Sequence, residues 1–118
     1  MDDLRALFAA WSGVPAELLD GWDFHAHRRA GRPAAIAAMQ GTEIHFAVAP
    51  EWRGRTIFRS VTRRFLEPLF ERRGYLTTRV MAGEPHGRFL ARLGFVKTST
   101  RDGVEYYMLM ALPFGRET

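Results

Sequence analysis

Residues 43–61 read EIHFAVAPEWRGRTIFRSV, and this stretch decides the fold. Apolar and polar side chains alternate from Glu43 to Ala49, which predicts a strand, and Pro50 ends the alternation. A basic turn with one glycine follows, and helical spacing begins near Thr56. A strand, a turn and a helix start in this order are typical of an anion site, because the first amides of a helix lack partners within the helix.

The residues before this stretch predict two short helices and an antiparallel meander. Apolar groups at helical spacing, and a proline suited to a first helical turn, predict helices over residues 2–11 and 15–19. Alternation predicts strands over residues 22–29 and 43–49, and a turn around Ala30-Gly31 leads to another strand over residues 34–39. Because short turns join these three strands, we expect them to pair in an antiparallel manner.

An amphipathic helix is predicted over residues 56–73, where Gly74 ends it. Phe58, Val61 and Phe65 form part of its apolar stripe. Pro68 lies inside this pattern. Proline removes a backbone hydrogen bond from a helix interior, so we expect a kink at this residue.

The remaining residues predict a strand, a short helix and a terminal hairpin. These elements span residues 76–82, 86–93, 95–100 and 104–112, with a favourable turn pair at Asp102-Gly103. The element order is α-α-β-β-β-α-β-α-β-β. We therefore expect an α/β (α+β) fold in a single domain over residues 1–118.

The composition favours an anionic partner. The chain of 118 residues has a formal net charge of +4, and Lys97 is the only lysine among 17 basic residues. Arginine suits phosphate because its planar fork donates two parallel hydrogen bonds, although a GC-rich genome also explains the arginine bias.

The absence of cysteine excludes disulfides and thiolate metal sites. No long apolar run or basic leader is present, so we expect a cytoplasmic protein with no membrane partner.

Three stretches resemble the GNAT superfamily of N-acetyltransferases. They read EIHFAVAPEWRGR, LTTRVMA and RFLARLGF, and a terminal hairpin follows the third. Their order and spacing cover about two thirds of the chain. The resemblance implies a mixed, mostly antiparallel sheet flanked by helices. It also implies transfer of an acetyl group from acetyl-CoA to an amine, with acetyl-CoA in a V-shaped opening between the family's fourth and fifth strands.

The resemblance implies a pyrophosphate-binding turn at the start of the central helix. The family pattern is [Q/R]-x-x-G-x-[G/A], and aligned to it are Arg53, Gly54, Arg55, Thr56, Ile57 and Phe58. Thr56 replaces a glycine, and Phe58 replaces a Gly or Ala. A small residue lets phosphate approach the backbone. The Phe58 ring therefore either points into the core or occupies the pyrophosphate position.

The resemblance also bears on the acyl-transfer chemistry. It implies that backbone N–H groups near Val48 polarise the acetyl carbonyl. Glu43 and His45 share a strand face and are candidates for the general base, or they simply lie on the wet face of a sheet. The family's general-acid tyrosine is matched by Leu90, which cannot donate a proton. Its asparagine is matched by Gly83 or Glu84.

Two further groups of side chains have alternative interpretations. Arg55, Arg59 and Arg63 lie at i, i+4 and i+8. Like charges at this spacing repel one another, so a CoA phosphate, nucleic acid, an acidic partner or nearby glutamates would stabilise them. The alternative is that they form a solvated helix face. His25 and His27 share a strand face, and His45 across from them would make a metal cluster. Since no further ligand spacing supports that cluster, we predict no metal.

Two functions follow from these observations. The first is an acetyl-CoA-dependent N-acyltransferase with a small-molecule or protein amine as acceptor. The second is a GNAT-fold interaction protein without catalysis, which Phe58 and Leu90 favour because they stand where the family enzyme has small or proton-donating residues. The compact form is also similar to small GNAT-like proteins of tailed bacteriophages. This resemblance implies a place in the host cytoplasm or virion. A virion protein or a second copy would be the partner, through an edge at YYMLMAL (residues 106–112). Nucleic acid is not expected as a partner.

Overall fold

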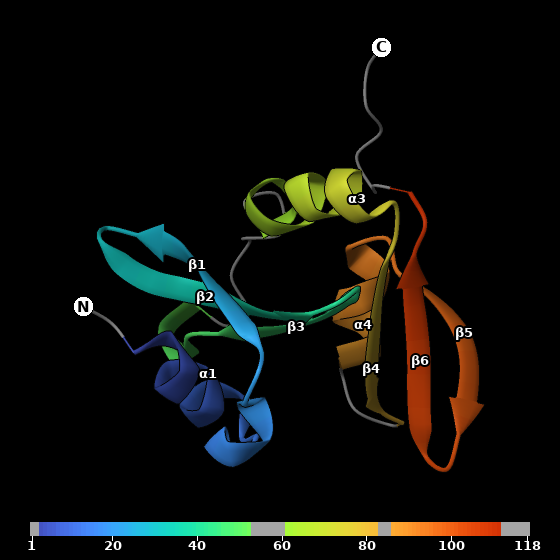
Figure 1. The fold of residues 1–118 in the computed structure, drawn as a ribbon, viewed down its shortest axis with the longest axis horizontal. Helices are drawn as coiled ribbons and strands as arrows, with labels where there is room; N and C mark the ends of the chain where they lie inside the picture. The colour runs from blue at the N-terminus through green and yellow to red at the C-terminus, as the bar shows by residue number, and fades with distance from the viewer. Residues whose placement is uncertain (1–2, 53–60, 83–85, 112–118) are drawn as a thin grey trace.

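A six-stranded sheet organises the protein (Figure 1). The computed structural model describes residues 3–52, 61–82 and 86–111. The strand order is β1-β2-β3-β4-β6-β5, and every neighbouring pair is antiparallel except β3 and β4. The strands are β1 (Asp23–Arg29), β2 (Arg32–Gln40), β3 (Glu43–Val48), β4 (Leu76–Met81), β5 (Val96–Arg101) and β6 (Val104–Leu109). The predicted mixed, mostly antiparallel sheet is therefore confirmed.

The predicted N-terminal helices are present. Helix α1 spans Leu4–Ser12, and the Asp3 carboxylate accepts a hydrogen bond from the Ala6 N–H at 3.1 Å. This N-cap satisfies one of the amides that a helix start leaves without an intrahelical partner. The second helix, η1, is a 3₁₀-helix over Ala16–Leu19, directly after Pro15.

Two tight turns set the register of the hairpins. Ala30 and Gly31 have φ values of 52° and 78°, and Asp102 and Gly103 have φ values of 53° and 76°. Paired left-handed residues suit two-residue hairpins, because their twist matches that of the flanking strands. The turn between β5 and β6 therefore lies where the Asp-Gly pair predicts it.

The central helix contains a π-helical turn rather than the predicted kink in a single α-helix. The π-turn η3 spans Thr62–Leu66, and helix α3 spans Glu67–Arg73. The Glu67 N–H donates to the Thr62 carbonyl oxygen, five residues back. Pro68 then falls in the first turn of α3, where a missing N–H is tolerated. The π-turn thus accommodates the proline. The predicted helix start at residues 56–60 lies outside the described residues.

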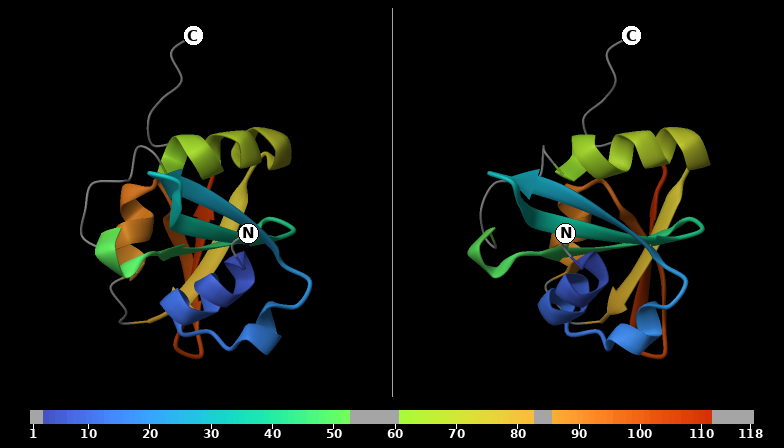
Figure 2. Two further views of the ribbon diagram at one scale, coloured as in Figure 1. Left: turned by 90° about the vertical axis from the view of Figure 1, so that its left-hand side faces the viewer. Right: turned by 60° about the vertical axis from the view of Figure 1, so that its left-hand side comes forward.

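Two apolar clusters cover the sheet, one on each face. On the first face, called here the α3 face, η3, α3 and α4 (His86–Arg92) pack on a core that includes Phe65, Leu76 and Leu109. On the second face, the α1 face, helix α1 packs through Phe8 on β1, β2 and β3. Figures 1 and 2 show α1 beneath these three strands only. Among the described residues, no helix covers β4, β6 and β5 on the α1 face.

The order of the strands corrects one prediction about the C-terminal hairpin. The strand that contains YYML is β6, and it lies between β4 and β5. Its backbone therefore pairs on both sides, and β5 forms the edge of the sheet instead. Among the described residues, no helix is long and apolar enough to cross a membrane.

Candidate active site

Strands β3 and β4 separate after a single point of contact. Their parallel pairing consists of one register position, Glu43 opposite Thr77. There the Thr77 N–H donates to the Thr42 carbonyl oxygen at 2.8 Å, and the two threonine hydroxyl oxygens lie 3.3 Å apart. No second register position joins these two strands over their described lengths. Backbone pairing between β3 and β4 is therefore limited to this one position among the described residues.

The peptide groups of β3 alternate in direction, which decides which amides face this opening. The Ala49 N–H donates to the Ala34 carbonyl oxygen of the β2 side at 2.9 Å. In an antiparallel ladder, every second residue points its N–H at the same neighbour. The N–H groups of Phe46 and Val48 therefore point toward the β4 side. Val48, the residue predicted to help polarise the acetyl carbonyl, is one of these two.

Glu43 and His45 form a hydrogen-bonded pair on the α1 face of β3. Their Oε2 and Nε2 atoms are 2.6 Å apart, and the side chains are 25% and 29% exposed. The edge of the Trp22 ring packs on the imidazole, with ring centroids 5.5 Å apart. Arg79 on β4 donates from Nε to the same Glu43 oxygen at 3.1 Å. The pair is therefore held from three directions beside the point where the strands part.

The surroundings of Glu43 indicate which member of this pair can act as a base. The hydrogen bond from His45 lowers the pKa of Glu43, burial opposes that shift, and the charges of His45 and Arg79 lower it further. A carboxylate with a lowered pKa is a weak base, and its Oε2 already accepts from Nε2 of His45. This hydrogen bond places the proton of a neutral imidazole on Nε2 and leaves Nδ1 as the basic nitrogen.

Lowering the pH should reduce the free energy of unfolding, because Glu43 becomes protonated. Its folded pKa lies below its ordinary value of 4.5. Its contribution to the free energy of unfolding is therefore complete above pH 4.5 and is lost as the pH falls through the folded pKa. We expect the acid limb of a stability profile measured by urea unfolding to be shallower for Glu43→Gln than for the wild type. Parallel acid limbs would contradict this.

The histidine cluster considered as a metal site does not form. His27 packs its ring on Phe65, with centroids 6.4 Å apart, so it lies on the α3 face. His25 shares that face by alternation along β1. His45 lies on the opposite face against Trp22. The sheet separates these side chains, and the described residues contain no group of three His, Asp or Glu suited to a metal.

Leu90 does not supply the proton donor that the family places on this helix, and neither does Tyr107, the described tyrosine beside α4. Leu90 is 4% exposed and belongs to the core on the α3 face. Tyr107 lies close to the start of α4, since a Cβ on Gly87 would stand 2.6 Å from its hydroxyl oxygen. Its hydroxyl donates to Glu105 Oε1 at 2.9 Å. Burial, and then Glu105, raise the pKa of Tyr107, so its hydroxyl is a weaker acid than that of an ordinary tyrosine.

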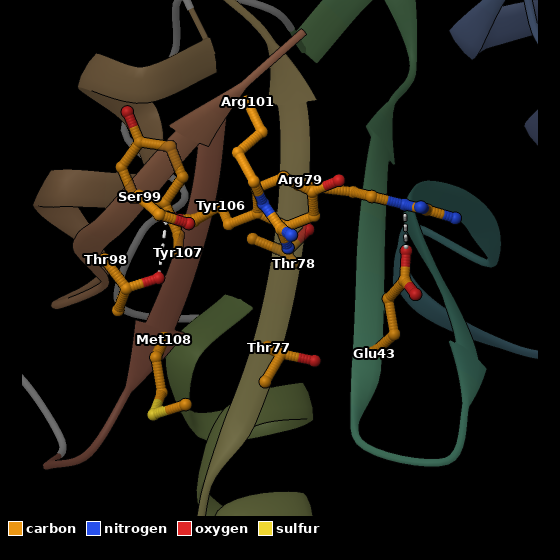
Figure 3. Close-up of a pocket in the computed structure, with 10 residues that line it drawn as sticks. All are labelled: Glu43, Thr77, Thr78, Arg79, Thr98, Ser99, Arg101, Tyr106, Tyr107 and Met108. Atoms are coloured by element: carbon orange, nitrogen blue, oxygen red, sulfur yellow. Dashed lines mark hydrogen bonds and ion pairs between the residues drawn. The ribbon is translucent and has the colours of Figure 1, made fainter. Parts of the chain in front are cut away.

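A hollow of about 290 Å³ lies beside the pair, on the part of the sheet without a covering helix (Figure 3). Glu43 stands at its border, and Arg79, Arg101 and Tyr106 contribute to its lining. Sequence reasoning did not single out the two arginines. Alternation in LTTRVMA already places Arg79 opposite to the buried side chains of β4. The missing information was the strand order, which brings β4 next to both β3 and β6.

Several predicted site residues lie outside the described part of the chain. They are Arg53, Gly54, Arg55, Thr56, Ile57 and Phe58 of the expected pyrophosphate turn, and Arg59 of the arginine row. Gly83 and Glu84, the candidates for the asparagine position, lie outside it as well. These predictions remain sequence-based.

The arrangement of strands and helices is the fold of the GNAT N-acetyltransferases. The chain is similar to the ribosomal-protein-S18-alanine N-acetyltransferase of Escherichia coli, with a TM-score of 0.65 and 18% identity over 98% of this chain and 90% of that one. For the ribosomal-protein-alanine N-acetyltransferase of Brucella melitensis the TM-score is 0.61, with 20% identity over 90% and 91% of the two chains.

A polyamine-modifying protein shares the same fold. The F149A mutant of spermidine N-acetyltransferase from Vibrio cholerae has a TM-score of 0.61 and 16% identity, over 80% of this chain and 72% of that one. No protein-family model matches the sequence, and no curated protein matches it. These structural likenesses establish the fold.

Proposed function

We propose that the protein is an acetyl-CoA-dependent N-acetyltransferase that acts on an amine. The observation that carries the proposal is the single contact between β3 and β4, beyond which the N–H groups of Phe46 and Val48 point toward the β4 side. Amide donors at such a place are suited to a thioester carbonyl, whose oxygen gains negative charge during attack. The fold of the described residues, shared with N-acetyltransferases, supports the same chemistry.

In the proposed reaction, the acceptor nitrogen attacks the thioester carbonyl carbon. A C–N bond forms, the C–S bond breaks, and the sulfur leaves as a thiolate. Nδ1 of His45 takes the amine proton, directly or through one water, while Glu43 holds the ring through Nε2. Glu43 is a positioning residue in this scheme. Because Leu90 cannot donate, the thiolate takes its proton from solvent.

For the diphosphate of the cosubstrate we propose the turn at residues 53–58, on sequence grounds alone. Arg53 and Arg55 offer charge, and Gly54 offers an approach to the backbone. Thr56 can donate its hydroxyl in place of the glycine amide. Phe58 must then direct its ring into the core, as its position in the apolar helix stripe permits.

One observation favours the second candidate function, a GNAT-fold interaction protein without catalysis. Leu90 is part of the buried core, at the position where the resemblance implies a catalytic tyrosine. A chain that had lost catalysis would tolerate this replacement. The resemblance to proteins of tailed bacteriophages belongs with this alternative and remains a prediction from the sequence.

Thermal unfolding with and without acetyl-CoA separates the two functions. Ligand at about 100 times its dissociation constant should stabilise the folded protein by about 2.7 kcal/mol, which is readily visible in Tm. Adenosine 3′,5′-bisphosphate is the control, because it offers phosphates without the pantetheine arm that would lie between β3 and β4. An unchanged Tm at millimolar acetyl-CoA would rule out the transferase and leave the interaction protein.

A further inference from the structure

One arginine in the hollow on the α1 face, Arg101, has no carboxylate partner among the described residues. Arg101, at the end of β5, stacks over the ring of Tyr106 with its guanidinium carbon 5.3 Å from the ring centroid. Within the described part of the chain, no ion pair involves Arg101. Arg79, by contrast, bonds to Glu43, and Lys97 lies 3.6 Å from Glu105. The hollow therefore contains a positive charge that the described protein does not neutralise.

The strand register connects this arginine to the proposed catalytic pair. Glu43 lies opposite Thr77, and on the next row Arg79 lies opposite Tyr106, which lies opposite Ser99 on β5. Arg101 lies on the same face two residues beyond Ser99, opposite Val104. Residues opposite each other in a sheet share a face, so a polar band crosses the α1 face from β3 to β5. In Figure 3 the Arg79 side chain reaches toward Glu43, while Arg101 approaches from the other side of the hollow.

The charges of the lining select the sign of a ligand. Glu43 contributes one negative charge and Arg79 and Arg101 contribute two positive charges, so the charged side chains in the lining sum to +1. Hydroxyl groups of Thr77, Ser99 and Tyr106 add hydrogen-bond donors. Since the positive charge of Arg79 balances the negative charge of Glu43, the remaining positive charge is that of Arg101. This sum favours an anionic group over a polycation in the hollow.

On the basis of the proposed function, we propose that the acceptor is an amine that carries a carboxylate or a phosphate. Its nitrogen lies at His45, and its anionic group lies in the hollow at Arg101. A guanidinium forms charge-assisted hydrogen bonds with either anion, and its stacking on Tyr106 holds it in place for that contact. The site therefore selects an acceptor of opposite charge to a polyamine.

Matched pairs of acceptors test this inference. Alanyl-alanine and its C-terminal amide differ by one carboxylate, O-phosphoethanolamine and ethanolamine differ by one phosphate, and spermidine is the polycation. We expect kcat/KM to favour the anionic member of at least one pair by about 10-fold to 100-fold, the range for a hydrogen bond to a charged group. The pair with the larger ratio identifies the anion.

The variant Arg101→Gln should raise KM for the anionic acceptor and reduce this preference to about 1. Lys97→Gln is the matched control, because it removes a positive charge from the same strand on the opposite face, where Lys97 lies opposite Tyr107. It should behave as the wild type. Equal rates within both pairs, a preference for spermidine, or equal effects of the two variants would overturn the proposal.

A binding experiment keeps the inference separate from the proposed function. If acetyl-CoA does not change Tm, the transferase proposal fails, and the anion site is then tested with N-acetyl-alanyl-alanine and its amide alone. We expect only the carboxylate form to shift the amide resonances of Ser99 and Tyr106, and only when Arg101 is present. Absence of shifts with this probe and with inorganic phosphate would overturn the anion site itself.

Discussion

Replacing Val48 with proline is expected to lower kcat/KM for acetyl transfer about 100-fold to 1,000-fold, the loss typical for one donor to a developing oxyanion. Proline has no N–H, and the N–H of Val48 points toward the β4 side of β3. The neighbouring N–H groups that pair with β2 remain. The substitution therefore leaves the β2–β3 ladder intact and removes an N–H from the β4 side of β3. Initial rates at fixed acceptor concentration measure the effect.

Val48→Ala is the matched control for this variant. It shortens the same half-buried side chain and keeps the N–H, so its activity should stay within a few-fold of the wild type. Urea unfolding of both variants reveals any difference in stability. If alanine and proline at residue 48 reduce the rate equally, the side chain rather than the peptide N–H is what matters, and the role given to this amide is wrong.

Replacing His45 with alanine is expected to lower kcat about 100-fold to 10,000-fold, the usual contribution of a positioned general base. The loss should be largest below the pKa of the acceptor amine, where a proton must be removed for attack. Added imidazole should restore part of the rate, because the substitution leaves space beside Trp22 and Glu43. A pH–rate profile recorded with and without imidazole measures both effects.

Two controls define what His45 does. His25→Ala removes an imidazole from the α3 face and should leave kcat unchanged. Glu43→Gln keeps the imidazole and loses the charged acceptor that orients it, so its kcat should fall less than that of His45→Ala. A rate for His45→Ala that equals the wild-type rate would show that the pair only stabilises the wet face of the sheet.

Local patterns predicted the elements well because each was encoded within a few residues. Alternation located β1 and β3, the turns on either side located β2, and the pairs Ala30-Gly31 and Asp102-Gly103 supplied the left-handed residues of their turns. The shared face of Glu43 and His45 followed from the two-residue period of a strand. These features need no knowledge of the rest of the fold.

Features that depend on tertiary packing were not accessible in this way. The contact between Glu43 and Arg79 joins residues that are 36 positions apart, and it exists only because β4 lies next to β3. The separation of His27 from His45 depends on which face of each strand meets α1 or α3. The π-turn at Thr62–Leu66 escaped prediction because an apolar stripe fits an α-helix and a helix with one π-turn equally well.

Every step of the proposed reaction requires that acetyl-CoA lie between β3 and β4, where the two strands part. A titration of isotope-labelled protein with acetyl-CoA, followed through backbone amide resonances, tests it most directly. We expect the largest shifts at Phe46 and Val48 on β3 and at Arg79 and Val80 on β4, with smaller shifts on β1. The proposal is contradicted if the resonances of these four amides do not move at saturating acetyl-CoA, or if the shifts are confined to α1 and β1.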